Sequence, residues 1–165
     1  MILQKLGVAI LPDGYGIIYQ SAAALSSLIY VSMGLLLIYR LGTRIFGQTI
    51  SFWGTLGIWL ATPLIYYMTM EPLSSQPFSF FCVSLFIYFW YQIQSKRNIY
   101  QWLILGGIGG LMSIIRYQDI LFLLIPILYQ IIRFSKKYNF EFLKDLVVFS
   151  LFVGIIISVQ LLVNY

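Results

Sequence analysis

Long apolar stretches separated by short polar breaks are the main feature of this sequence. A run such as LILGGIGGLMSII (residues 103–115) is apolar on every side, whereas a strand of a membrane barrel would alternate apolar and polar positions. Stretches of roughly 15 to 25 such residues match a hydrocarbon layer about 30 Å thick at 1.5 Å per helical residue. The six stretches lie at about 16–39, 46–68, 78–94, 99–115, 120–134 and 145–163. The pattern predicts an all-α fold, a polytopic transmembrane helical bundle of about six spans.

The short breaks between these stretches predict antiparallel neighbours within a single membrane domain covering residues 1–165. The sequence has no soluble domain, no Pro- or Ser-rich linker and no convincing internal repeat. Pro63 and Pro126 fall inside two predicted spans, where proline usually bends a helix. Gly106 and Gly110 have the spacing that lets two membrane helices approach closely.

The composition agrees with a membrane protein. Of the 165 residues, 61% are hydrophobic and only 9% are charged, against about 25% charged in an ordinary soluble domain. A soluble fold of this size could not bury so much apolar surface. The chain is therefore expected to be an integral, multi-pass membrane protein in contact with membrane lipid.

The distribution of Lys and Arg predicts the orientation, because short loops rich in these residues remain cytoplasmic. Eight of the ten lie in alternate loops: Arg40, Arg44, Lys96, Arg97, Arg133, Lys136, Lys137 and Lys144. The opposite side holds only Lys5 and Arg116. This places the loop around MEPLSSQP (residues 70–77), the turn at Arg116 and the first fifteen residues outside. The net charge of +5 is then mainly a topology signal, and no nucleic-acid partner is expected.

The amino end allows two interpretations. Residues 1–14 would lie outside, yet no signal peptide precedes the first span. Either a short tail crosses the membrane unaided, or the chain is the later part of a longer protein that lacks its first helices and first outer loop. The second interpretation is the one we expect.

The absence of histidine limits the possible chemistry. A Ser-His-Asp triad, a histidine base and a zinc site of the usual kind are excluded for this chain. The single Cys82 lies inside a span, where a buried thiol is usually inert. Acid–base or metal chemistry would have to use carboxylates, Tyr, Lys or Arg.

Besides Lys5, four charged residues map to the outer side, namely Asp13, Glu71, Arg116 and Asp119. Arg116 ends one span, where a cation suits the helix dipole, and Asp119 begins the next as a plausible N-cap. That structural interpretation needs no function. Against it, the fourteen steps from Asp119 to Arg133 give only about 21 Å of helix, so the turn at Arg116 would be recessed where a lipid-linked anion could reach it.

Two segments carry a family resemblance. LIYYMTMEPLSSQPFSFFCVSLFIYFW (64–90) and GGIGGLMSIIRYQDILFLLIPILYQ (106–130) resemble the middle of a GT-C membrane glycosyltransferase of the dolichyl-phosphate-mannose protein mannosyltransferase and aminoarabinose-transferase type. The resemblance covers roughly residues 11–135. Bacterial members have an acidic residue and proline, then a small-residue stretch often ending in Ser-His, and later a glycine-rich helix ending in Arg. This similarity implies a multi-pass protein of the bacterial plasma membrane.

The resemblance also implies a function. Such enzymes transfer a sugar from a polyprenyl-phosphate donor to a glycan, lipid or protein acceptor on the outer side of the membrane. It implies substrate-binding roles for Glu71 and Arg116, with Gln76 standing where many relatives have His, and Asp119 is the neighbouring candidate. No catalytic residue is assigned, because the family's acidic base lies in a first outer loop that this sequence does not contain. The chain alone is therefore expected to be inactive.

Sugar transfer requires cationic or metal stabilisation of the departing phosphate, which Arg116 could provide because its guanidinium matches phosphate bidentately. Glu71 could orient Arg116 or help to hold a divalent metal ion, although no cofactor is assigned. Two alternatives remain: a transporter or flippase component whose charges line a substrate path, and an inactive membrane remnant. Charges near one face, rather than through the membrane depth, favour the transferase.

Overall fold

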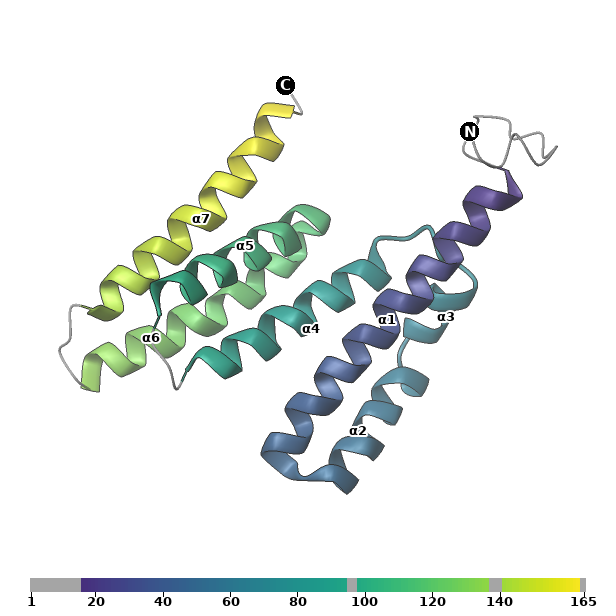
Figure 1. Ribbon diagram of the computed structural model, residues 1–165, viewed down its shortest axis with the longest axis horizontal. Coiled ribbons are helices and arrows are strands. Elements are labelled where there is room, and N and C mark those ends of the chain that lie inside the picture. The colour runs from purple at the N-terminus through teal and green to yellow at the C-terminus, as the bar shows by residue number, and fades with distance from the viewer. Residues whose placement is uncertain (1–15, 95–97, 137–140, 164–165) are drawn as a thin grey trace.

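The computed structural model describes residues 16–94, 98–136 and 141–163, and these residues are almost entirely helical with no strand among them (Figure 1). The side chains of 133–136, 141–143, 161 and 163 are not described, and Asp13, Lys96, Arg97 and Lys137 lie outside the described ranges. The elements are α1 (Ile17–Phe46), α2 (Gln48–Ala61), α3 (Leu64–Thr69), α4 (Gln76–Ile93), α5 (Ile99–Ile115), the 3-10 helix η2 (Tyr117–Leu123), α6 (Leu124–Lys136) and α7 (Glu141–Val163). The all-α prediction is confirmed for the described residues.

Helix boundaries follow local signals to different degrees. The predicted span at 99–115 coincides with α5, which Asn98 caps by accepting a hydrogen bond from the Tyr100 amide at 3.1 Å. Helix α1 continues past the predicted end at 39, because nothing breaks it before Gly47, whose φ of +86° suits glycine alone.

Two predicted spans are not continuous α-helices. The stretch 46–68 is divided into α2 and α3 at Pro63, which has no amide hydrogen to continue the helix. For the stretch 120–134, the predicted start of the helix was wrong. The chain forms the 3-10 helix η2 from Tyr117 and becomes α-helical only at Leu124. Pro126 therefore lies in the first turn of α6, where its missing N–H costs no helical hydrogen bond.

The helices alternate in direction along the chain (Figure 1). Helices α1, α4 and α6 run in one direction. Helices α2 and α3 together, α5 and α7 run in the opposite direction. The α3–α4 connection and the junction of α5 with η2 consequently lie at the end of the bundle where α1 begins. This is the end that the charge pattern assigns to the outer side.

The core lies between α4, α5 and α7. Phe86, Leu105, Met112 and Phe149 are fully buried, and the Trp102 and Phe149 rings meet edge to face at a centroid distance of 6.3 Å. Helix α1 packs on α4, and α6 packs on η2 and α7. Cys82 is buried in α4 as a free thiol, as predicted.

The glycines of α5 are in close contact with α7, as their spacing predicts. A Cβ atom on Gly106 would lie 2.9 Å from the carbonyl oxygen of Phe149, and one on Gly110 would lie 2.8 Å from the Cβ of Ile156. Neither position can hold a larger residue unless α7 moves. These contacts hold α5 against α7.

One described helix, Ile17–Phe46, is long and apolar enough to cross a membrane by length and composition. Two shorter apolar helical segments, Ile99–Ile115 and Tyr117–Ile132, were also found in the described part of the chain. The six-span arrangement therefore remains a prediction.

Candidate functional site

The amino end of α4 meets the junction of α5 and η2, and most of the predicted site residues lie there. Arg116 directly follows α5, and its backbone is extended at φ −146° and ψ 116°. Its amide still donates to the Met112 carbonyl at 3.1 Å, while its own carbonyl accepts from the Asp119 amide at 2.9 Å. The position of Arg116 at the carboxyl end of this helix is as predicted.

Two glutamine amides hold the half-buried Arg116 side chain. Its Nη1 donates to Oε1 of Gln76, the first residue of α4, and its Nη2 donates to Oε1 of Gln118 at 2.9 Å. Amide oxygens orient a guanidinium without neutralising it, and no carboxylate within the described ranges forms an ion pair with Arg116. Among the described residues, the guanidinium is therefore left without an anionic partner and is available to bind an anion.

Asp119 does not act as the N-cap that the sequence predicted. Because η2 begins two residues earlier, at Tyr117, Asp119 lies inside the 3-10 helix and is only 7% exposed. Its Oδ2 accepts a hydrogen bond from the Ser79 hydroxyl of α4 at 2.5 Å. Buried carboxylates are rarely tolerated without such a partner.

Ser79 and Gln118 are site residues that the sequence reasoning missed. A signal for Ser79 was available, because Gln76 and Ser79 are three residues apart and so lie on one face of α4. Both side chains of that face reach the segment that carries Arg116 and Asp119.

Glu71 lines neither of the two cavities that Arg116 lines. It is exposed in the connection between α3 and α4, and no ion pair joins it to Arg116 among the residues described. The connection is fixed instead by Ser27 of α1, whose hydroxyl donates to the Pro72 carbonyl at 2.6 Å. The structure thus brings together Gln76, Arg116 and Asp119, and Glu71 is not part of this group.

Arg116 lines two cavities. The first, called here the Arg116 cavity, has a volume of about 430 Å³. It is lined by Thr62, Pro63, Leu64, Tyr67, Gln76, Ser79, Phe80, Val83, Arg116, Asp119 and Phe122. The second, called here the Gln160 cavity, has about 470 Å³ and is lined by Ser75, Ser113, Ile114, Ile115, Arg116, Tyr117, Gln118, Ile120, Ile157 and Gln160. The arginine is thus accessible from two spaces formed by different helices.

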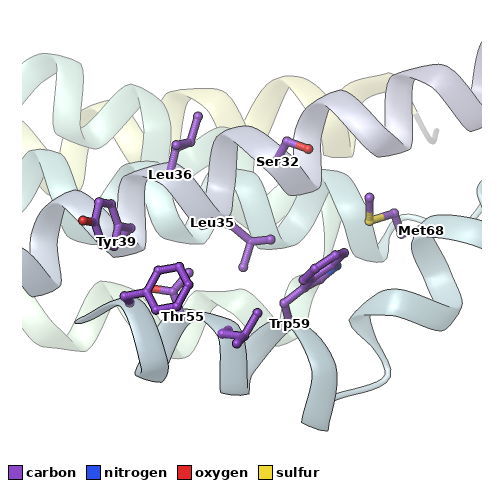
Figure 2. Close-up of a pocket in the computed structure, with 9 residues that line it drawn as sticks. Ser32, Leu35, Leu36, Tyr39, Thr55, Trp59 and Met68 are labelled. Carbon is purple, nitrogen blue, oxygen red and sulfur yellow. The ribbon is translucent and has the colours of Figure 1, made fainter. Parts of the chain in front are cut away.

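A third space has a different character. The groove between α1 and α2, called here the apolar groove, has about 340 Å³ and no charged lining residue. It is lined by Ser32, Leu35, Leu36, Tyr39, Phe52, Thr55, Leu56, Trp59 and Met68. In Figure 2, Leu35 of α1 and Trp59 of α2 point toward each other across it. Without a cation, this groove is not a candidate phosphate site.

The described part of the chain contains no group of three or more His, Cys, Asp or Glu that could hold a metal ion. The divalent ion that the sequence allowed therefore stays a prediction, and Arg116 is the cationic group of this site.

Comparison with known proteins adds one finding to this geometry. A family model described as dolichyl-phosphate-mannose-protein mannosyltransferase matches residues 4–162. The match includes every residue of the site. No curated protein matches the chain, and no solved structure matches it.

Proposed function

The chain belongs to the dolichyl-phosphate-mannose-protein mannosyltransferase family, and from this premise we propose that Arg116 binds the phosphate of a polyprenyl-phosphate-linked sugar on the outer side of the membrane. Members of this family are integral membrane glycosyltransferases. The donor sugar would pass to a glycan, lipid or protein acceptor.

The observation that supports this proposal is the state of the Arg116 guanidinium. Two amide oxygens fix its orientation, and no carboxylate of the described residues pairs with it. A guanidinium forms two parallel hydrogen bonds to phosphate oxygens. An arginine kept only as a membrane anchor would not need two side chains to orient it.

The chemistry of transfer gives Arg116 its role. The acceptor hydroxyl gives up its proton to a base, for which no residue is assigned, and its oxygen attacks the anomeric carbon of the sugar. The bond from that carbon to the phosphate oxygen breaks, and the polyprenyl phosphate leaves with the electron pair. Negative charge therefore grows on the phosphate during the step, and an oriented cation stabilises it there. Arg116 would bind the donor and also assist departure of the lipid phosphate.

The proposal includes a multi-pass topology in a bacterial plasma membrane. The alternating helix directions and the eight basic residues in alternate loops support it. Single cysteines at Ser75 and at Ser95, in a Cys82→Ser background, should react with an impermeant maleimide from opposite sides of the membrane. Reaction of both from the same side would refute this topology.

Arg116→Lys tests the phosphate role, because lysine keeps the charge but loses the two-pronged geometry. Purified chain in lipid nanodiscs should bind farnesyl phosphate, a short prenyl phosphate, and the variant should bind it roughly 10- to 150-fold more weakly, since a charge-assisted contact is worth about 1.5 to 3 kcal/mol. Isothermal titration calorimetry measures this difference.

Arg44→Lys is the matched control. Arg44 lies in the last turn of α1, with its guanidinium carbon 5.5 Å from the centre of the Tyr88 ring. It lines neither the Arg116 cavity, nor the Gln160 cavity, nor the apolar groove. Its substitution should leave the affinity unchanged. If Arg116 only anchors the helix end at the interface, lysine would serve equally well, and an Arg116→Lys chain with wild-type affinity would refute the proposed function.

A further inference from the structure

We infer that the Arg116 cavity receives the sugar ring of the donor, and that Asp119, held by Ser79, binds the hydroxyl groups of that sugar. This inference rests on the proposed function, in which Arg116 holds the phosphate. It adds a second group to the site, a buried carboxylate whose ligand is the sugar rather than the phosphate.

The first argument is the unused hydrogen-bonding capacity of Asp119. An ionised carboxylate has about four acceptor positions. The Ser79 hydroxyl occupies one of them, and the described residues provide no further side-chain donor to this carboxylate. Because Asp119 is 93% buried yet lines the cavity, a ligand in that cavity is the partner that can satisfy it. Sugar hydroxyl groups are donors of this kind.

The second argument is the mixed lining of the cavity. Gln76, Ser79 and Asp119 provide polar atoms on one part of it, whereas Phe80 and Phe122 provide apolar rings. A pyranose or furanose ring has the same division, with hydroxyl groups around its edge and C–H groups on its faces. The volume of about 430 Å³ lies within the range of small-molecule sites, roughly 300–1,000 Å³.

The third argument is the position of the cavity relative to the phosphate site. In a polyprenyl-phosphate sugar the anomeric carbon is joined directly to a phosphate oxygen, so the sugar must lie next to whatever holds the phosphate. Arg116 and Asp119 line one cavity, three residues apart in the chain. A single ligand can therefore reach both.

The other two spaces do not fit the sugar as well. The Gln160 cavity also touches Arg116 but has no carboxylate, and the hydroxyl of its Ser113 already donates to the Gly109 carbonyl at 2.8 Å. The apolar groove has no charged group at all. Of the three, the Arg116 cavity is the one lined by a carboxylate, which can accept hydrogen bonds from several hydroxyl groups.

The inference makes an unusual prediction about the variant Asp119→Asn. The amide has nearly the same size and can still accept the hydrogen bond from Ser79, but it loses the negative charge. Binding of the sugar should weaken, because hydrogen bonds to a charged acceptor are stronger than those to a neutral one. Binding of a phosphate without sugar should stay the same or become tighter, because a negative charge near Arg116 is removed.

The experiment compares farnesyl phosphate with its mannosyl, glucosyl, galactosyl and 4-amino-arabinosyl esters, each titrated calorimetrically into the full chain in nanodiscs. The wild-type chain should bind at least one ester more tightly than farnesyl phosphate. Asp119→Asn should reduce that advantage about 10-fold, and Ser79→Ala should reduce it about 3-fold by freeing the carboxylate from its support. If Asp119→Asn does not fold, Ser79→Ala still tests the sugar subsite.

Ser84→Ala is the control for Ser79→Ala. Ser84 is another buried serine of α4, but its hydroxyl donates within the helix to the Phe80 carbonyl at 2.6 Å and it does not line the cavity. It should leave all affinities unchanged.

The outcomes separate the two proposals. If no ester binds more tightly than farnesyl phosphate, or if folded Asp119→Asn and Ser79→Ala chains keep the full advantage of the ester, the sugar subsite is refuted while the phosphate role of Arg116 stands. If Arg116→Lys leaves binding of farnesyl phosphate itself unchanged, the proposed function fails first and the sugar subsite fails with it.

Discussion

The helix pairs α5–α7 and α1–α2 both contain glycines, but those of α5 and those of α2 have different surroundings. Added Cβ atoms at Gly106 and Gly110 of α5 would lie within 3 Å of α7 atoms. At Gly54 and Gly57 of α2 they would meet nothing within 4 Å. The α1–α2 pair is close near Gly42, and the apolar groove lies between the same two helices farther along.

The difference explains where the candidate site lies. Arg116 directly follows α5, so the tight contact with α7 fixes the backbone from which its side chain extends. A phosphate site needs such a fixed support, because a misplaced donor loses much of its effect. The looser α1–α2 pair leaves apolar surface suited to lipid chains.

The largest expected effect is on stability in the core of the tight pair. Leu105→Ala removes a fully buried side chain of α5 and should lower the free energy of unfolding by about 3 kcal/mol, in the lower half of the usual range for such cavities, because lipid also solvates leucine. Leu36, 57% exposed beside the apolar groove, is the control, and Leu36→Ala should change stability little. Detergent-titrated unfolding followed by circular dichroism measures both, and equal losses would mean that the pairs are packed alike.

The next largest loss of stability is expected from a larger side chain placed in the contact between α5 and α7. Gly110→Leu would place a side chain against Ile156 and cost roughly 1 to 3 kcal/mol, because α7 must move away. Gly57→Leu on α2 enters open space and should not lower the free energy of unfolding. We also expect Gly110→Leu to weaken farnesyl phosphate binding through displacement of Arg116, and unchanged binding would show that the α5–α7 contact does not support the site.

A smaller effect is expected at Ser27, which links α1 to the connection bearing Glu71. Ser27→Ala removes the hydrogen bond to the carbonyl of the half-buried Pro72 and should cost about 0.5 to 1.5 kcal/mol in the same unfolding assay. Ser26→Ala is the control, because its hydroxyl only donates to the Ala23 carbonyl within α1. Equal effects of the two exchanges would remove the argument that Ser27 holds the connection.

The smallest expected effect is an increase in the free energy of unfolding. Gly57→Ala adds a methyl group to an exposed position of α2 with no atom nearby, and should stabilise the chain by about 0.5 to 1 kcal/mol because alanine favours the helix. The same exchange at Gly106 should instead destabilise it, since the new Cβ would meet the Phe149 carbonyl. Gains at both positions would show that α5 and α7 can separate without cost.

Much of the helical organisation was accessible from local sequence. The apolar stretch of residues 99–115 matches α5, and Gly106 and Gly110 make the close contact that their spacing predicts. The break at Pro63 was also visible, although it divides a helix rather than bending it. The start of the stretch after Arg116 was predicted wrongly, because 3-10 and α-helical turns have nearly the same pattern over a few apolar residues.

The candidate site could be predicted from the sequence only in part. Sequence reasoning identified Gln76, Arg116 and Asp119, which the structure brings together, but it included Glu71, which does not line the Arg116 cavity, and missed Ser79 and Gln118. It also gave Asp119 a capping role, whereas the side chain is used for a contact with another helix.

The sequence by itself determined the helical class, the charge asymmetry and the position of Arg116 at a helix end, because hydrophobicity and backbone hydrogen bonding within a helix are local properties. The tertiary structure decided the contacts from Gln76 to Arg116 and from Ser79 to Asp119, each between residues 40 positions apart. Such contacts depend on the rotation of α4 and on the 3-10 geometry of η2. Each helical residue turns by about 100°, so a shift of one residue would turn Ser79 away from Asp119.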